Sequence, residues 1–208
     1  MWVAKLGGSL AYSARLPDWL GALLGLPVVL VPGGGPFADQ VRAAQRRWKF
    51  ADAVAHRMAL MAMEQYGEMI CALQAGLEPA SSQAAIETIL ERGDIPVWMA
   101  LDMVSAAPGI GRSWDITSDS LAAWLAELLG AEGLLLIKSA PIEPGPVSVD
   151  RLMETGLVDK GFGRCAPTGG VVWILSDSTA AAGSGGRLLR EIVGGAEPPR
   201  HAACWVAT

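Results

Sequence analysis

Cysteine and histidine are scarce in this chain, which limits the kinds of site it can build. Its 208 residues include three cysteines, Cys71, Cys165 and Cys204, and two histidines, His56 and His201. The cysteines are far apart, odd in number and form no CxxC pair, which argues against a disulfide framework and a structural zinc site. We therefore predict no metal held by protein side chains and a reducing, cytoplasmic setting.

Charged residues are also few. They make up 18% of the chain, the formal net charge is -5 and the isoelectric point is about 5.0. Proteins that bind nucleic acid broadly need a basic surface, so this composition argues against a nucleic-acid partner. An anionic ligand would have to be bound by a few placed cations and by backbone N–H groups.

A long, unbroken apolar helix is missing as well. Residues 19–38 carry no charge, but they contain Pro27, Pro32 and three consecutive glycines, so they cannot form one membrane-spanning helix. The apolar stretch at the N-terminus is short and ends at a glycine pair, unlike a signal peptide. We expect no membrane partner.

Short apolar segments alternate with helical patterns along the chain. We predict strands at 2–6, 27–32, 96–101, 133–137, 171–175 and 202–206, helices at 16–25, 37–48, 51–75, 82–92, 117–130, 149–157 and 186–193, and a loop at 140–147. This alternation predicts an α/β fold in one domain, with a mainly parallel sheet covered by helices on both faces. In such sheets ligands bind beyond the carboxyl ends of the strands.

The first predicted strand ends in Lys5, Leu6, Gly7, Gly8 and Ser9. A lysine at the end of a buried strand is unusual, because a buried cation without a partner is costly. The two glycines allow a close approach of the backbone to a ligand and point N–H groups at it. The segment is either a small phosphate cradle or a tight turn whose lysine reaches solvent.

A second glycine run follows the strand at 27–32. Gly33, Gly34 and Gly35 precede a predicted helix whose N-terminus favours an anion. Arg42 in that helix can clamp a phosphate or a carboxylate. The alternative is a flexible turn with a solvated arginine.

Two further segments carry polar residues at element ends. Thr117, Ser118 and Asp119 open an apolar helix, where they also fit simple N-capping. Lys138 ends the strand at 133–137. Two lysines at strand ends and one aspartate suit phosphoryl transfer, which needs mainly positioning and electrostatic stabilisation.

The order and spacing of these motifs resemble the amino-acid-kinase superfamily: Lys5-x-Gly7-Gly8-Ser9, Pro32 to Gly35, and Thr117 to Ala122. The resemblance implies a three-layer αβα sandwich. It also implies a phosphoryl-transfer enzyme that uses ATP, with Mg²⁺ held mainly through the nucleotide phosphates, and a homo-oligomer, dimeric or larger. Lys5 would contact the transferring phosphoryl group, Gly7, Gly8 and Ser9 would hold the ATP phosphates, and Gly33 to Gly35 would face the acceptor.

Further segments resemble one branch, the aminomethyl-furanmethanol phosphate kinases of methanofuran biosynthesis. They are Phe50 to His56, Ser113 to Ser120, and Leu157-Val158-Asp159-x-x-Phe162. The branch implies that a small phosphorylated aminomethyl-furan receives the second phosphate. His56 and Trp114 are candidates for the acceptor side, with Arg42, Thr117 and Ser118. His56 is otherwise a core residue, and Trp114 either stacks on the furan ring or fills the core.

The chain also departs from the superfamily. Where many members have Thr-Asp-x-x-Gly, this chain has Lys138-Ser139-Ala140-Pro141. Many members also carry a second catalytic lysine further along the chain, but residues 161–170 contain none here. Either Lys138 takes the role of that lysine, with Ser139 beside it at the nucleotide, or ATP is held differently, or catalysis is impaired. Residues 1–130 would form the acceptor and phosphate half and residues 131–208 a reduced nucleotide half. The alternatives are another small-acid or phosphate kinase and a non-catalytic nucleotide- or anion-binding protein.

Overall fold

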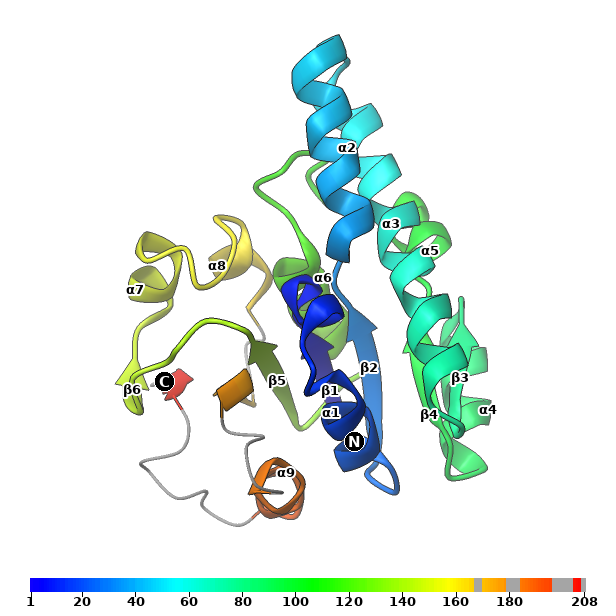
Figure 1. Cartoon of the computed structure of the whole chain (residues 1–208), viewed down its shortest axis with the longest axis vertical. Coiled ribbons are helices and arrows are strands. Elements are labelled where there is room, and N and C mark those ends of the chain that lie inside the picture. Colours follow the sequence, from blue (N-terminus) through cyan, green and yellow to red (C-terminus); the bar gives the residue numbers. More distant parts are fainter. Residues whose placement is uncertain (167–169, 179–183, 196–203, 207–208) are drawn as a thin grey trace.

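The computed structural model describes residues 1–166, 170–178, 184–195 and 204–206 (Figure 1). The strands are β1 (Trp2–Leu6), β2 (Val28–Pro32), β3 (Leu77–Ala80), β4 (Ile95–Trp98), β5 (Gly133–Lys138), β6 (Gly145–Val147), β7 (Val171–Ser176) and β8 (Cys204–Val206). The helices are α1 (Leu16–Leu23), α2 (Gly35–Trp48), α3 (Asp52–Leu73), α4 (Gln83–Glu91), α5 (Ala100–Ala106), α6 (Ser118–Leu128), α7 (Val149–Glu154), α8 (Phe162–Cys165) and α9 (Ser184–Val193), with a short 3-10 helix, η1 (Gly8–Tyr12).

The strands form one eight-stranded sheet in the order β3-β4-β2-β1-β5-β7-β8-β6. All pairs are parallel except β7 with β8. Every residue of β1, β2, β4 and β5 is buried, as expected for parallel strands covered on both faces. The predicted α/β fold with a mainly parallel sheet is confirmed.

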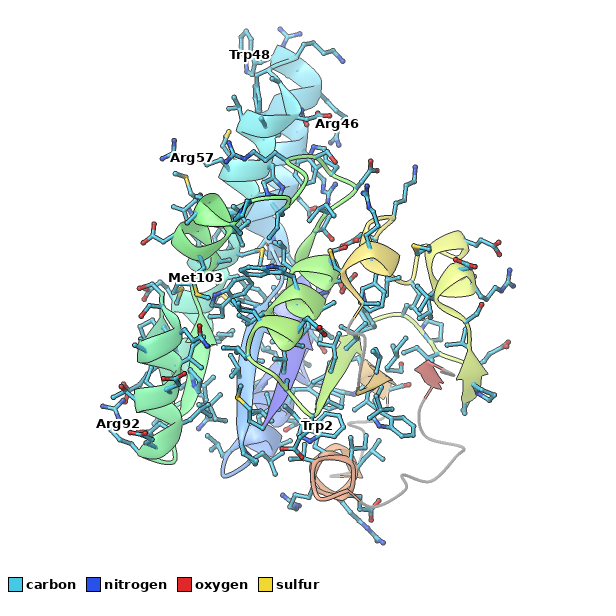
Figure 2. The ribbon with its side chains drawn as sticks, turned by 180° about the vertical axis from the view of Figure 1, so that it is seen from behind. Trp2, Arg46, Trp48, Arg57, Arg92 and Met103 are labelled. Atoms are coloured by element: carbon cyan, nitrogen blue, oxygen red, sulfur yellow. The ribbon has the colours of Figure 1, made fainter. Side chains whose placement is uncertain are left out.

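Two apolar clusters lie on opposite faces of the sheet and make the chain a three-layer sandwich. On one face Val3 and Leu136 pack with Leu121 and Leu125 of α6. On the other face α1 and α9 cover the sheet, with side chains that include Trp19, Leu20, Leu188 and Leu189. Figure 1 shows α1 in front of the sheet, and Figure 2, drawn from behind, shows α6 in front.

Some elements differ from the sequence prediction. The strand expected at 96–101 ends at Trp98, because the chain turns into α5 at Ala100. The loop expected at 140–147 contains the short strand β6. β3 was not predicted, since it contains Pro79, but it lies at the sheet edge, where proline is tolerated. Within the strand predicted at 202–206, residues 202–203 lie outside the described residues.

The pair of helices α2 and α3 extends beyond the sheet. In Figure 1 it rises from the end toward which the arrowheads of β1, β2 and β5 point. The chain after β1, β2 and β5 and the start of α6 therefore gather beside the root of this pair. In the described part of the chain, none of the helices is both long enough and apolar enough to cross a membrane.

Candidate active site

The register of the central sheet brings two lysines to the same face. Lys5 of β1 is paired with Leu136 of β5, and Lys138 follows two residues later. Because side chains alternate along a strand, Leu136 and Lys138 point to the same side as Lys5. That side is the one covered by α6.

Asp119, in the first turn of α6, lies between the two lysines. Its Oδ1 is 2.8 Å from Lys5 Nζ, and its Oδ2 accepts a 2.6 Å hydrogen bond from Lys138 Nζ. The exposed fractions are 4% for Lys5, 6% for Asp119 and 9% for Lys138. The structure thus brings together the three residues that the sequence predicted to be catalytic.

The cluster carries one more positive than negative charge. Burial alone would raise the pKa of Asp119, but the charges of Lys5 and Lys138 outweigh it and hold that pKa below its usual value. Burial, helped by the charge of Lys5, lowers the pKa of Lys138 to about 8, although Asp119 opposes the shift. A buried cluster with an excess positive charge favours an anionic ligand.

The two glycine loops that follow β1 and β2 lie against each other. A Cβ on Gly33 would meet the nitrogen of Gly8 at 2.5 Å, and a Cβ on Gly8 would meet the nitrogen of Gly35 at 2.5 Å. The Gly33 N–H also donates to the carbonyl of Leu6 at 2.9 Å. The absence of side chains is therefore a requirement of packing between the loops, in addition to any role toward a ligand.

Replacing Gly33 tests this packing. We expect Gly33→Ala to push the two loops apart and to lower the rate of the predicted phosphoryl transfer by about 100-fold, since a shift of about 1 Å in a positioned group can have that effect. Steady-state kinetics with a melting curve measure it. The control is Gly21→Ala, because a Cβ added at Gly21 would meet no atom within 4 Å, and this variant should keep full turnover. Gly93 is also exposed, but its φ of +82° would strain an alanine. Equal kinetics for both variants would contradict the account.

Two adjoining cavities open beside the lysine cluster. The lysine cavity, of about 590 Å³, is lined by the charged cluster, the loops after β1 and β5, and residues 153 and 156–160. The helix cavity, of about 230 Å³, lies among α2, α3 and the start of α6. Both are lined by Gly8, Ser9, Arg42, Trp114 and Thr117. A ligand in one cavity can therefore reach a ligand in the other at these shared residues.

Nearly all the predicted site residues line one of these cavities. The lysine cavity has Lys5, Gly7, Asp119, Lys138 and Ser139, the helix cavity has Gly34, Gly35, His56 and Ser118, and the five shared residues complete the set. The exception is Gly33, which lines neither and packs on Gly8 instead. Ser9 and Ser139 also meet across β1 and β5, with their hydroxyl oxygens 2.6 Å apart.

Arg42 and Trp114 form a unit at the boundary between the cavities. The Arg42 guanidinium lies 3.8 Å from the centre of the Trp114 ring, a cation–π contact. Trp114 Nε1 donates to Oε1 of Gln45 at 2.6 Å. The guanidinium therefore occupies one face of the ring, and any stacking on a ligand has to use the other face.

His56 is buried in the wall of the helix cavity. Burial lowers its pKa, the nearby charge of Arg112 lowers it further, and a hydrogen bond with the backbone of Ser113 opposes the shift. The imidazole is therefore neutral at pH 7, so it adds no positive charge for a phosphate. Its Nε2 is buried and has no hydrogen-bond partner among the described residues.

Asp159, which is not among the predicted site residues, lines the lysine cavity and is central to the site. Its carboxylate accepts bonds from the backbone N–H of Thr117 at 2.9 Å and of Ser120 at 3.1 Å, and from the hydroxyls of both residues. It also accepts from the N–H of Gly161 at 3.2 Å. The motif Leu157-Val158-Asp159-x-x-Phe162 was the available signal, but its spatial target cannot be derived from spacing.

Comparison with known proteins identifies related sequences. Residues 1–141 match the model of the amino acid kinase family. The chain is 26% identical over 142 residues to [5-(aminomethyl)furan-3-yl]methyl phosphate kinase of Methanocaldococcus jannaschii, which is 65% of this chain and 64% of that protein. It is 43% identical over 56 residues to acetylglutamate kinase of Parasynechococcus marenigrum, 27% of this chain and 18% of that protein. The chain thus spans less than two thirds of each relative.

Solved structures share the fold over the full length. Uridylate kinase from Archaeoglobus fulgidus has a TM-score of 0.71 at 14% identity, and the alignment covers 99% of this chain and 99% of that one. UMP kinase from Ureaplasma parvum has a TM-score of 0.69 at 12% identity, covering 100% of this chain and 95% of that one. At such low identity these likenesses establish the architecture alone.

Proposed function

Because the chain belongs to the amino acid kinase family, we propose that it transfers the γ-phosphate of ATP to a small acceptor that already carries a phosphate. The observation that carries the proposal is the buried cluster of Lys5, Asp119 and Lys138, whose net positive charge faces the lysine cavity. The acceptor proposed is an aminomethyl-furanmethanol phosphate, and the product is its diphosphate.

The proposed reaction is an in-line displacement. An oxygen of the acceptor phosphate forms a bond to the γ-phosphorus, the bond from that phosphorus to the β,γ-bridging oxygen breaks, and ADP leaves with the bonding electrons. Lys5 and Lys138 would stabilise the negative charge that develops on the transferring group, because preorganised charges of this kind lower the energy of the transition state. Asp119 keeps both ammonium groups in place and is too well ion-paired to act as a base.

The lysine cavity has the chemistry that a triphosphate needs. It combines two ammonium groups with the Gly7–Ser9 loop, where a Cβ on Gly7 would meet the Ile137 carbonyl at 2.9 Å. Among the described residues no group of three or more His, Cys, Asp or Glu side chains is placed to hold a metal ion. We propose that Mg²⁺ binds through the nucleotide phosphates, where it would neutralise charge. Residues 131–208 would then form a small nucleotide half.

The helix cavity fits a small acceptor with an apolar ring. Leu60, Met63 and Leu121 supply apolar walls, and Arg42 at the boundary with the lysine cavity can hold the acceptor phosphate. The neutral His56 lines this cavity and not the lysine cavity, so an amino group at the opposite end of the acceptor can hydrogen-bond to it. The likeness to the Methanocaldococcus jannaschii enzyme supports the same acceptor.

ADP release in a coupled assay tests the acceptor. The panel holds aminomethyl-furanmethanol phosphate, isopentenyl phosphate, UMP, acetylglutamate and carbamate, each with ATP and Mg²⁺. We expect turnover with the furan phosphate and little with the others. Preferential turnover of another acceptor would replace the furan phosphate as the proposed acceptor, and the proposal that the chain is a kinase would stand. Nucleotide binding without turnover on any acceptor would favour the non-catalytic binding protein.

The titration of Lys138 predicts a pH dependence. We expect kcat/KM to fall as the pH rises through about 8, because Lys138 loses the proton that stabilises the transferring phosphate. In kcat the fall should come at higher pH, since bound phosphates favour the charged lysine.

The folded pKa of Lys138 lies below its unfolded value, so between about pH 8 and 10.5 this group makes folding more favourable as the pH rises. A melting temperature that does not fall while kcat/KM falls separates titration from unfolding, and a flat kcat/KM profile up to pH 9.5 would refute the assignment.

We also propose that the chain forms a homodimer through the α2–α3 pair. Trp48, 73% exposed, lies at its free end in Figure 2, and Val54 and Met61 are exposed along α3. Large exposed apolar side chains on one helix pair suit an interaction surface. We expect light scattering to give the mass of a dimer for the wild type and of a monomer for the Val54→Asp/Met61→Glu variant. Leu128→Glu, on the exposed end of α6, should remain dimeric, and a monomeric wild type at about 100 µM would disprove the dimer.

A further inference from the structure

The first turn of α6 is capped by a residue from another part of the chain. Thr117 is the N-cap residue, and its hydroxyl makes no capping bond to the helix. Asp159 supplies the acceptor instead, through its bonds to the N–H groups of Thr117 and Ser120. A carboxylate at this position satisfies N–H groups that a helix start leaves unpaired, and it interacts favourably with the helix dipole.

The capped residues flank the catalytic aspartate. Thr117 and Ser120 lie two residues before and one residue after Asp119, and both are bonded to Asp159 through backbone and side chain. The orientation of the Asp119 carboxylate toward Lys5 and Lys138 therefore depends on the same turn. A substitution at residue 159 can move the lysines through this turn, and it can change the pKa of Lys138 through the loss of its charge.

The segment that carries Asp159 packs closely against the residues before α6. The Gly161 N–H donates to the carbonyl of Asp115 at 2.7 Å, and a Cβ on Gly161 would meet that oxygen at 2.6 Å and Ile116 Cδ1 at 2.3 Å. Residues between α7 and α8 thus lie directly on the turn before α6. The same segment lines the lysine cavity.

We propose that Asp159 is the positioning residue of this site: its carboxylate holds the first turn of α6 and so aims Asp119 at both lysines. The role in turnover rests on the proposed kinase function. Asp159 also bears a negative charge that raises the pKa of Lys138, against the lowering by burial and Lys5. Besides Lys138, the charged side chains that line the lysine cavity are Lys5, Arg42, Asp115, Asp119, Asp159 and Lys160.

The test compares Asp159→Asn with Asp150→Asn, an exposed aspartate in the first turn of α7. The first readout is kinetic. We expect Asp159→Asn to lower kcat by about 10- to 100-fold with little change in KM for ATP, because misaligned catalytic groups slow the chemical step more than binding. Asp150→Asn should match the wild type.

The second readout does not need turnover. The chain has four lysines, at positions 5, 49, 138 and 160, so the ¹³Cε signal of Lys138 can be assigned by its loss in Lys138→Arg. We expect the wild-type signal to titrate near pH 8 and the Asp159→Asn signal at lower pH. Because the lost charge of Asp159 can by itself shift this signal, Ser120→Ala, which removes one bond to Asp159 and keeps the charge, is titrated as well. A purely structural role would lower the melting temperature and leave the Lys138 titration of Ser120→Ala in place.

The outcomes separate the two proposals. A wild type without transferase activity would end the kinase function, while a shifted Lys138 titration in Ser120→Ala, which keeps the charge of Asp159, would still support the positioning role. Wild-type kcat together with an unshifted titration in Asp159→Asn would overturn the positioning role. If that variant does not fold, Ser120→Ala removes one bond to Asp159 and keeps the charge. It should lower kcat several-fold, and wild-type kcat in Ser120→Ala would overturn the proposal.

Discussion

Lys5→Ala should lower kcat about 1,000-fold, with a small effect on KM. Lys5 Nζ lies 2.8 Å from Asp119 and lines the lysine cavity, where we propose that the transferring phosphoryl group binds. Such an interaction is stronger in the transition state than in the ground state, so its loss appears in kcat. Single groups that stabilise a transferring phosphate or an oxyanion have effects of about 10² to 10⁵.

The control for Lys5→Ala is the same substitution at Lys49, the exposed C-cap residue that follows α2. Lys49→Ala should keep wild-type kinetics. Lys5→Ala should remain folded, because Asp119 keeps its 2.6 Å bond to Lys138 and no carboxylate is left unpaired. A folded Lys5→Ala variant with more than about a tenth of wild-type kcat would refute the mechanism, since such a loss is below the range for a transition-state contact.

Asp119→Asn should affect both activity and stability. The change keeps the shape of the side chain but leaves two buried ammonium groups without a carboxylate. Removing one partner of a buried ion pair costs about 3 kcal/mol or more of the free energy of unfolding. For a chain of this size that corresponds to roughly 6–12 °C in Tm. Turnover should fall by at least about 100-fold, because Asp119 no longer positions Lys5 and Lys138.

Thermal unfolding and steady-state kinetics at pH 7 measure the two effects of Asp119→Asn, with Asp150→Asn as the charge-matched control. The ionised carboxylate is the stable form at that pH, since the pKa of Asp119 lies below its usual value. Its contribution to stability should fade as the pH falls through that lowered pKa. An Asp119→Asn variant that melts at the wild-type temperature would show that the ion pairs contribute nothing measurable to the fold.

The sequence predicted the sheet and the cluster of two lysines and an aspartate because both follow local rules. Buried strands that end in Lys5 and Lys138 must meet at one edge of a parallel sheet, and a polar helix start after residue 116 belongs to the same edge. The role of Gly33 in loop packing was not predictable, because it depends on the approach of Gly8 from another strand.

Asp159 was missed for a similar reason. Its bonds span 39 to 42 residues of chain, and only the folded positions of the α7–α8 segment and α6 relate them. The short elements β3, β6 and α8 also escaped prediction, since they have three or four residues each and their stability comes from neighbours.

A ³¹P NMR spectrum of the purified protein with ATP, Mg²⁺ and aminomethyl-furanmethanol phosphate follows phosphoryl transfer directly. We expect the acceptor's phosphate signal to be replaced by the two coupled signals of a diphosphate, in step with conversion of ATP to ADP. With Lys5→Ala we expect both substrates to stay unchanged over the same time. An unchanged acceptor signal with intact ATP, or release of inorganic phosphate alone, would contradict phosphoryl transfer to this acceptor.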